Sequence, residues 1–309
     1  MAGLVPAIHV DPRAKPGDDD LRESTNLIVP HIDRPTFLSQ FSVPLLAPVI
    51  GHRGAAGHAP ENTLISLRRA KELGCSWVEF DVRLTADGVP VLCHDSRLDR
   101  TTDGKGLVSG QTVAAIQKHD AGSWFDPAFA NERVPTLEEA LLVAAELDLG
   151  TNIELKADRG QQYQIGAAVA ATLDRLQGRI PAVLVSSFHP IGLNAVDKLV
   201  PHLPRGILFR VIPRNWSDIA SRFQCGVIGA DHRRLRPRRI AEIRGAGYQL
   251  AAYTVNDPRR AQALFSWGVT SVFTDVPDII LLVSRRQPPV WHSAAGAPFS
   301  VETRQGAMQ

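Results

Sequence analysis

Apolar residues in the central part of the chain fall into short runs that alternate with stretches of helical spacing. Eight runs are strand-like: Pro48–His52, Trp77–Val82, Thr151–Leu155, Ala182–Ser187, Gly206–Arg210, Val227–Ala230, Leu250–Val255 and Ser271–Thr274. The helical stretches are Asn62–Leu73, Thr136–Leu147, Gln161–Leu176, Pro190–Leu199, Asn215–Phe223, Arg236–Arg244, Pro258–Trp267 and Pro277–Ser284. Eight alternating units over ~240 residues predict a (β/α)8 TIM-type barrel of the α/β class, with an open doubly wound sheet as the alternative.

One segment departs from this alternation. Val89–Cys93 is a further strand-like run, separated from Trp77–Val82 by a link that contains Asp87-Gly88. Asp-Gly is a turn signal, and so short a link cannot hold a parallel crossover, so we expect an antiparallel return strand. Pairing across this turn would carry His94 back towards Glu79. Residues 97–133 have weaker periodicity and many turn residues, which indicates a short insertion after the second strand.

Both ends of the chain lack a clear period. Prolines recur through residues 1–46, which also contain the acidic run Asp18–Asp20, and residues 286–309 are rich in Pro, Ala, Gly and Ser. Such composition is typical of disordered or loosely attached segments. We therefore expect one barrel domain over residues 47–285, between a loose N-terminal extension and a flexible tail.

Composition excludes several classes of protein. Hydrophobic residues make up 44% of the chain and charged residues 21%, as in ordinary globular proteins, and the formal net charge of +2 does not favour nucleic acid as a partner. The three cysteines, Cys75, Cys93 and Cys225, form no CxxC pair, so neither a zinc site nor a disulfide framework is predicted. We find no convincing secretory signal or membrane span, and the expected location is the cytoplasm.

Carboxylates gather where the predicted strands end. Glu79 and Asp81 are two residues apart on one strand, so their side chains point to the same face, and Glu154 lies near the end of the next parallel strand. Ionised carboxylates on one inward face need a cation, a proton or a basic partner. A hard divalent ion such as Mg²⁺ or Ca²⁺ prefers these oxygen ligands. The alternative is a buried salt-bridge network with Arg53 and Lys156.

Two histidines, His52 and His94, stand beside these carboxylates at the ends of neighbouring strands. Histidine titrates near neutrality and is the commonest general acid or base, so the pair suits an in-line displacement at phosphorus. A core or metal-ligating role is the alternative for either residue. Arg53 and Lys156 follow the same strand ends and could counter charge on phosphoryl oxygens.

A basic run, His232–Arg239, reads HRRLRPRR and is expected at a loop and helix start. Such a run usually forms a solvated surface. Contact with an anionic lipid or substrate is the second interpretation.

The stretch from His52 to Asp95 resembles the signature of the glycerophosphodiester phosphodiesterase family. Later landmarks in the same order are similar to that family as well: ELK at 154–156, SSF at 186–188, YTVN at 253–256 and TDVP at 274–277. The resemblance covers roughly residues 47–284. It implies a TIM-type barrel with an insertion after the second strand, and hydrolysis of glycerophosphodiesters to an alcohol and sn-glycerol 3-phosphate.

The resemblance also implies roles for individual residues. The catalytic acid–base pair would be His52 and His94, and one divalent ion would be held by Glu79, Asp81 and Glu154. The phosphate would be contacted by Arg53 and Lys156, and the glycerol end of the pocket would be lined by Phe188 and Tyr253. Tyr253 stands where family members often have tryptophan, which affects substrate preference and adds a hydroxyl that needs a partner. Glu61 belongs to the signature, either as a site residue or as the residue that fixes the first loop and caps the helix beginning near Asn62.

Two chemical routes fit these residues. Either the glycerol 2-hydroxyl attacks phosphorus and water then opens a cyclic phosphate, or a metal-activated water attacks directly. One rival assignment is a phosphodiesterase that acts on lysophospholipids or phosphoinositol headgroups. An apolar or strongly basic patch at the pocket mouth would favour it. The other rival is a non-catalytic barrel that binds phosphate esters. The expected partner is a small molecule, and a homo-oligomer is compatible with the sequence.

Overall fold

The computed structural model describes residues 45–284, and within them nine strands form one sheet. The strands are β1 (Val49–Gly51), β2 (Trp77–Leu84), β3 (Pro90–Leu92), β4 (Gly150–Leu155), β5 (Val183–Ser187), β6 (Arg205–Phe209), β7 (Val227–Asp231), β8 (Gln249–Tyr253) and β9 (Ser271–Thr274). β1 pairs in parallel with both β9 and β2, so the eight parallel strands close into a ring, with the antiparallel β3 attached to β2. The predicted barrel is confirmed, and the open sheet is excluded.

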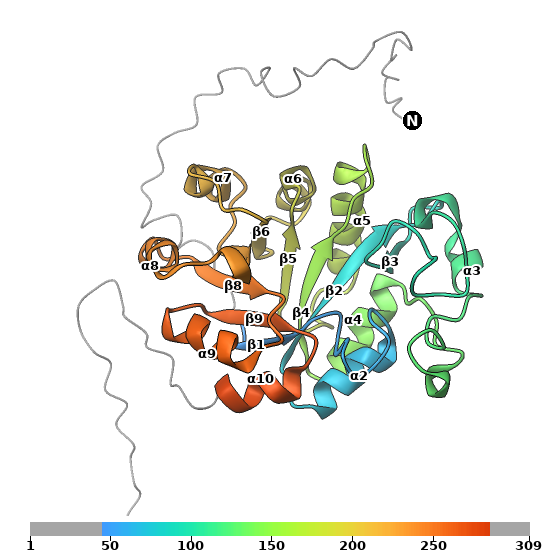
Figure 1. Ribbon diagram of the computed structural model, residues 1–309. Helices are drawn as coiled ribbons and strands as arrows, with labels where there is room; N and C mark the ends of the chain where they lie inside the picture. Colours follow the sequence, from blue (N-terminus) through green and yellow to red (C-terminus); the bar gives the residue numbers. More distant parts are fainter. Residues whose placement is uncertain (1–44, 285–309) are drawn as a thin grey trace, which may run out of the picture.

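Helices surround this ring in Figure 1. They are α2 (Leu64–Glu72), α4 (Leu137–Glu146), α5 (Gln162–Arg175), α6 (Pro190–Leu199), α7 (Trp216–Arg222), α8 (Pro237–Gly245), α9 (Pro258–Ser266) and α10 (Pro277–Ser284). Their buried faces pack on the strands in one apolar core that includes Val78, Phe80 and Ile153. The helical spacing of the sequence therefore predicted each of them.

The first helix begins two residues later than predicted, and the reason is local. Asn62 has a positive φ of 59°, outside the helical region, and its side chain is engaged with Asp81. The helix is capped instead by Thr63, whose hydroxyl accepts a hydrogen bond from the backbone N–H of Ser66. Hydrogen bonds to the neighbouring strand β2 thus override the helical pattern at Asn62.

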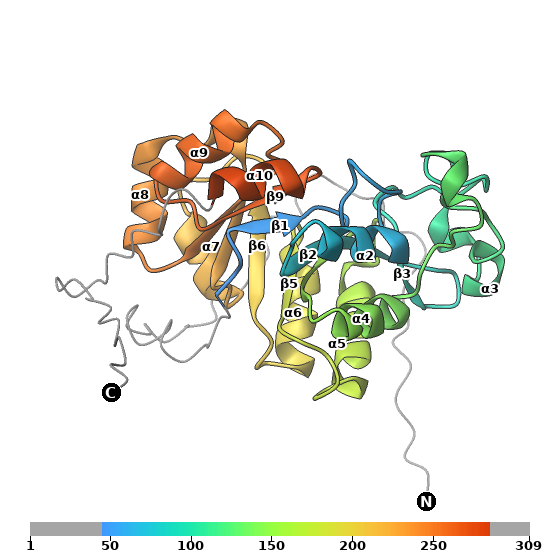
Figure 2. The ribbon, with the colours of Figure 1, turned by 90° about the horizontal axis from the view of Figure 1, so that it is seen from below.

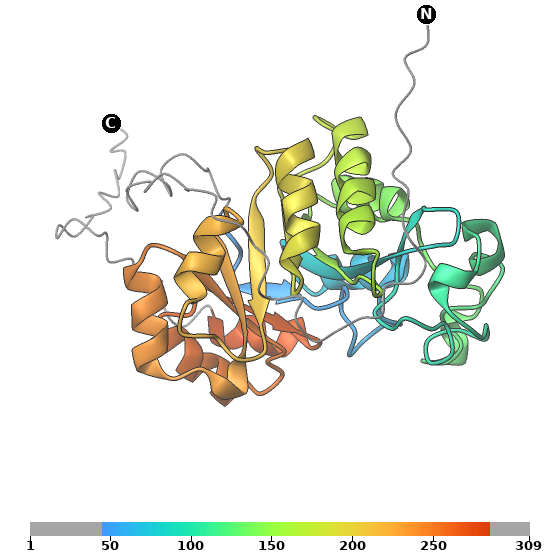
Figure 3. The same cartoon turned by 90° about the horizontal axis from the view of Figure 1, so that it is seen from above.

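The predicted return strand is present as β3, joined to β2 by a tight turn. Gly88 has a φ of +77°, which favours glycine, and Val82 pairs with Leu92. The following segment carries the short helices η1 (Val108–Gly110), α3 (Val113–Ile116) and η2 (Pro127–Phe129). It has a small apolar cluster of its own, made of Val91, Cys93, Leu98, Val108, Ile116, Ala121 and Val134. Figures 1, 2 and 3 all place this insertion on the side of the molecule away from α8.

A separate apolar cluster fills the barrel interior below the polar site. It contains Leu46, Ile50, Trp77, Leu184, Val227, Ala251 and Phe273. Trp77 pairs with Gly150 on the neighbouring strand, where a Cβ would lie 2.4 Å from the indole ring. Glycine at this position therefore makes room for the tryptophan. Glu79 and Asp81 follow Trp77 at intervals of two and rise above this apolar layer.

The first described residues are already tied to the barrel. Leu46, one residue before the expected start, is buried and its backbone N–H donates to Gln249. The predicted loose segments lie almost entirely outside the described residues. Between residues 45 and 284, no helix combines the length and apolarity needed to span a bilayer.

Candidate active site

The side chains predicted to carry chemistry all come from the carboxyl ends of the parallel strands or from β3. They are His52 and Arg53 after β1, Glu79 and Asp81 on β2, His94 after β3, Glu154 and Lys156 at the end of β4, Phe188 after β5, and Tyr253 at the end of β8. In a closed parallel barrel these ends share one mouth, where such enzymes place their active sites. The structure thus brings the predicted residues to one face.

Three carboxylates meet in the mouth. Glu79, Asp81 and Glu154 each offer an oxygen, and these atoms lie within 4.8 Å of one another. Asp81 and Glu154 are direct partners on neighbouring strands, and all three residues are buried. Burial and the Asp81 charge raise the pKa of Glu79 to about 8, and the same two causes raise the pKa of Glu154. Close packing of these acids therefore opposes their simultaneous ionisation.

Basic residues neutralise part of this charge. Lys156 Nζ lies 2.5 Å from Glu154 Oε1 and 3.3 Å from Asp81 Oδ1, and Arg53 Nε lies 3.1 Å from Asp81 Oδ2. Burial alone would raise the pKa of Asp81, but Lys156 and Arg53 hold it below its usual value. The salt-bridge network expected as an alternative is therefore present together with the acidic cluster.

A residual need for a cation remains at Glu79. Its Oε2 accepts the backbone N–H of Arg53 at 3.0 Å, but its buried Oε1 has no hydrogen-bond partner among the described residues. A hard divalent ion takes carboxylate oxygens of this kind. The residues present therefore fit one divalent ion and form a candidate metal site.

His52 is oriented by a carboxylate from the far end of the chain. Its Nδ1 lies 2.6 Å from Asp275 Oδ1, and Asn256 donates to the other oxygen of Asp275 at 2.6 Å. Its Nε2 lies 3.9 Å from Glu79 Oε2. Burial would lower the pKa of His52, but Asp275 and Glu79 outweigh burial and raise it.

His94 has a corresponding carboxylate partner, its chain neighbour. Its Nδ1 lies 2.7 Å from Asp95 Oδ1, and Arg83 donates to its backbone carbonyl at 2.8 and 2.9 Å. Burial lowers the pKa of His94, against the opposing effect of the nearby Asp81. Since both histidines bind a carboxylate through Nδ1, both have Nε2 free to exchange a proton with a bound molecule.

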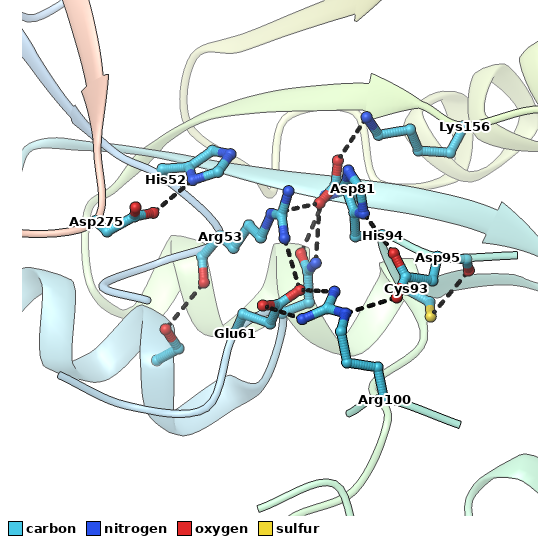
Figure 4. A network of polar contacts seen from close by, with 12 residues as sticks. His52, Arg53, Glu61, Asp81, Cys93, His94, Asp95, Arg100, Lys156 and Asp275 are labelled. Atoms are coloured by element: carbon cyan, nitrogen blue, oxygen red, sulfur yellow. Dashed lines mark hydrogen bonds and ion pairs between the residues drawn. The ribbon is translucent and has the colours of Figure 1, made fainter. Parts of the chain in front are cut away.

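A guanidinium from the insertion connects the two sides of the site, as Figure 4 shows. Arg100 donates to both oxygens of Glu61 at 2.8 Å and to Asp95 Oδ2 at 2.6 Å. Glu61 in turn accepts from Arg53 Nη1 at 2.7 Å. Glu61 thus fixes the first loop and is not the cap of the first helix. Glu61 links Arg100 to Arg53, and Asp95 links Arg100 to His94.

Two aromatic rings form a wall next to Lys156. Phe188 and Tyr253 pack edge to face with ring centroids 5.7 Å apart, and Lys156 Nζ lies 5.6 Å from the centroid of Phe188. The hydroxyl of Tyr253 donates to the backbone carbonyl of Phe209 at 2.8 Å. The tyrosine hydroxyl therefore has the partner that its burial requires.

Sequence reasoning assigned no role to four residues that hold this site together: Asn62, Asp95, Arg100 and Asp275. Asp95 and Asp275 did carry a signal, because Asp275 directly follows β9 and Asp95 follows β3 by three residues. Arg100 lies in a segment of weak periodicity, so only the folded chain shows its contacts.

We expect replacement of Arg100 by alanine to lower kcat/KM by about ten- to a hundredfold, because Glu61 and Asp95 both lose the group that positions them. Steady-state kinetics on a glycerophosphodiester would measure the loss, and added guanidinium ion should restore part of it. Arg97→Ala is the matched control, since within residues 45–284 the Arg97 side chain bonds to Asp99 and not to Glu61 or Asp95. Equal activities of the two variants would contradict a positioning role.

Comparison with known proteins gives a consistent result. Residues 52–279 match the model of the glycerophosphoryl diester phosphodiesterase family. The protein YhdW of Bacillus subtilis is 37% identical over 240 residues, which cover 75% of this chain and 96% of that protein. A glycerophosphodiester phosphodiesterase of Caldanaerobacter subterraneus is 33% identical over 77% of this chain and 98% of its own.

A solved structure is similar over the same region. It is an Oleispira antarctica phosphodiesterase in complex with the product sn-glycerol-3-phosphate. The two structures superpose with a TM-score of 0.76 and 37% identity, over 78% of this chain and 97% of that one. This similarity agrees with the barrel described above.

Proposed function

The chain belongs to the glycerophosphoryl diester phosphodiesterase family, and we propose that it hydrolyses glycerophosphodiesters to an alcohol and sn-glycerol 3-phosphate. The observation that carries the proposal is one mouth holding both histidine–carboxylate pairs and the three clustered acids. The similar Oleispira antarctica structure was solved with sn-glycerol-3-phosphate as product, which supports the choice of substrate. Release of glycerol 3-phosphate from glycerophosphocholine would test it.

In this proposal Glu79, Asp81 and Glu154 hold one divalent ion, Mg²⁺ or Ca²⁺. The bound ion would supply Lewis-acid stabilisation of charge on the phosphoryl oxygens. Arg53 and Lys156 add positive charge from the protein, and both already lie against Asp81. The phosphate would thus sit among groups that favour the charge of the transition state.

His52 and His94 are proposed to move the protons. One imidazole accepts the proton of the attacking hydroxyl, and the other donates to the departing alcohol oxygen. Asp275 and Asp95 hold the two rings through Nδ1 and leave Nε2 for this transfer. The same pair serves attack by the glycerol 2-hydroxyl or by water. Phe188 and Tyr253 would pack against the carbon atoms of the glycerol.

We expect Lys156→Ala to lower kcat/KM for the diester by about a hundredfold, because one cation facing the phosphate is lost. Steady-state kinetics would measure it, with Lys198→Ala on the exposed end of α6 as the control. An unchanged kcat/KM in Lys156→Ala would remove this lysine from the phosphate site.

The non-catalytic alternative predicts a different outcome. A barrel that only binds phosphate esters would show no turnover of several diesters, with or without added ion. The family match and the two intact histidine–carboxylate pairs favour the enzyme. A cytoplasmic location belongs to the same proposal, and cell fractionation would test it.

A further inference from the structure

The basic run noted in the sequence borders the mouth of the barrel. Asp231 ends β7 and is followed at once by η3 (His232–Arg234). Around them lies an open hollow of about 580 Å³ lined by Asp231, Arg233, Arg234 and Arg236. Since β7 is a barrel strand, its carboxyl end opens on the same face as the candidate active site.

The ring places this hollow across the mouth from the acidic cluster. Strand β7 is four positions from β2 whether the ring is followed through β8, β9 and β1 or through β6, β5 and β4. Figures 1, 2 and 3 likewise place α8, which begins beside the hollow, on the opposite side from the insertion. A molecule bound at Glu79 and Asp81 would have to cross the mouth to reach it.

The aromatic wall of Phe188 and Tyr253 connects the acidic cluster with the hollow. Tyr253 is the pairing partner of Asp231 across β7 and β8, and it packs on Phe188, which in turn lies against Lys156. Burial raises the pKa of Tyr253, and the charges of Asp231 and Glu154 raise it further. The charges of Arg210 and Arg233 oppose this rise. One phenol is therefore within electrostatic reach of both the acidic cluster and the hollow.

The hollow has a local excess of positive charge. Its lining contains three arginines and one acidic residue, although the whole chain has a net charge of only +2. That acid, Asp231, is already engaged by the side chain of Arg233 at 2.8 and 3.0 Å. Within residues 45–284, Arg234 forms no ion pair with an acidic side chain. Such a cluster attracts anions.

The backbone under the hollow is held in place, unlike that of an ordinary solvated run. Arg260 of α9 donates to the carbonyls of His232 and Leu235 and lies 5.0 Å from the ring of Trp267. Arg236 donates to the carbonyls of Arg233 and Leu235 at 3.0 Å. Arg234 therefore projects from a fixed turn, and a guanidinium in this setting can bind phosphate through two parallel hydrogen bonds.

We propose that the hollow is a second phosphate subsite, and that the preferred substrates are glycerophosphodiesters carrying a further phosphate. This inference rests on the proposed function and narrows its substrate class. The scissile phosphate would lie at the acidic cluster, the connecting carbon atoms against Phe188 and Tyr253, and the second phosphate at Arg234.

The test compares glycerophosphoglycerol with bis(glycerophospho)glycerol, in which the shared glycerol carries a second glycerophosphate group and thus a second phosphate. The wild-type kcat/KM should be at least about tenfold higher for the second compound, as one charge-assisted contact allows. Arg234→Ala should abolish most of this preference by raising KM for the bisphosphate, and Arg234→Glu should reverse it. Arg238→Ala is the matched control, because Arg238 belongs to the same run but does not line the hollow.

Each outcome decides the inference. Turnover of both compounds without a preference, or a preference that survives in Arg234→Ala, would overturn the second subsite and leave the proposed function standing. No turnover of either compound by the wild-type protein would refute the proposed function and this inference with it. Loss of binding to anionic lipid vesicles in Arg234→Ala, without any preference between the free diesters, would assign the hollow to a membrane surface instead.

Discussion

Replacement of His52 by alanine is expected to lower kcat by about a thousandfold, because the reaction loses a positioned proton donor or acceptor. The ring is held by Asp275 at 2.6 Å, and its Nε2 points towards the acidic cluster, 3.9 Å from Glu79. Turnover of glycerophosphocholine would measure the loss. Asp275→Asn should give a smaller decrease, since the imidazole remains but is less firmly oriented.

The chain offers a matched control for this experiment. His58 lies in the same loop and also pairs with a carboxylate, Asp278, at 2.8 Å, but it is not part of the acidic cluster. His58→Ala should therefore keep wild-type kcat. If His52→Ala retained more than about a tenth of the wild-type kcat while its fold was intact, the acid–base role would be wrong.

Removal of divalent ions should have the second large effect. We expect treatment with EDTA to abolish turnover, and excess Mg²⁺ or Ca²⁺ to restore it, because the charge building on phosphorus oxygens would lose its strongest counter-charge. Glu79→Gln should raise the ion concentration needed for half-maximal activity by at least about tenfold, since one anionic ligand becomes neutral.

Ion binding can be followed without catalysis as well. Added ion should raise the Tm of the wild-type protein, because it relieves the repulsion among three buried carboxylates, and it should raise the Tm of Glu79→Gln much less. Glu72→Gln, on the exposed end of α2, is the control and should behave as wild type. Full activity in the presence of EDTA would exclude the ion from the mechanism.

The amino-acid sequence by itself determined the local structure and the shared face of Glu79 and Asp81. The alternation of apolar runs and helical stretches predicted each barrel strand, and Asp87-Gly88 predicted the antiparallel return of β3. The spacing of Glu79 and Asp81 placed both carboxylates on one face of β2. These features depend on periods of two and 3.6 residues, which a sequence displays directly.

Only the tertiary structure decided which strand ends meet. Closure through β1 and β9 brings Asp275 to His52, 223 residues away, and packing of the insertion brings Arg100 to Glu61 and Asp95. The same closure sets the arginine-lined hollow opposite β2. Local periodicity cannot predict such contacts, because they depend on the order of the strands around the barrel. They also depend on a weakly periodic insertion, whose position is fixed by packing and ion pairs.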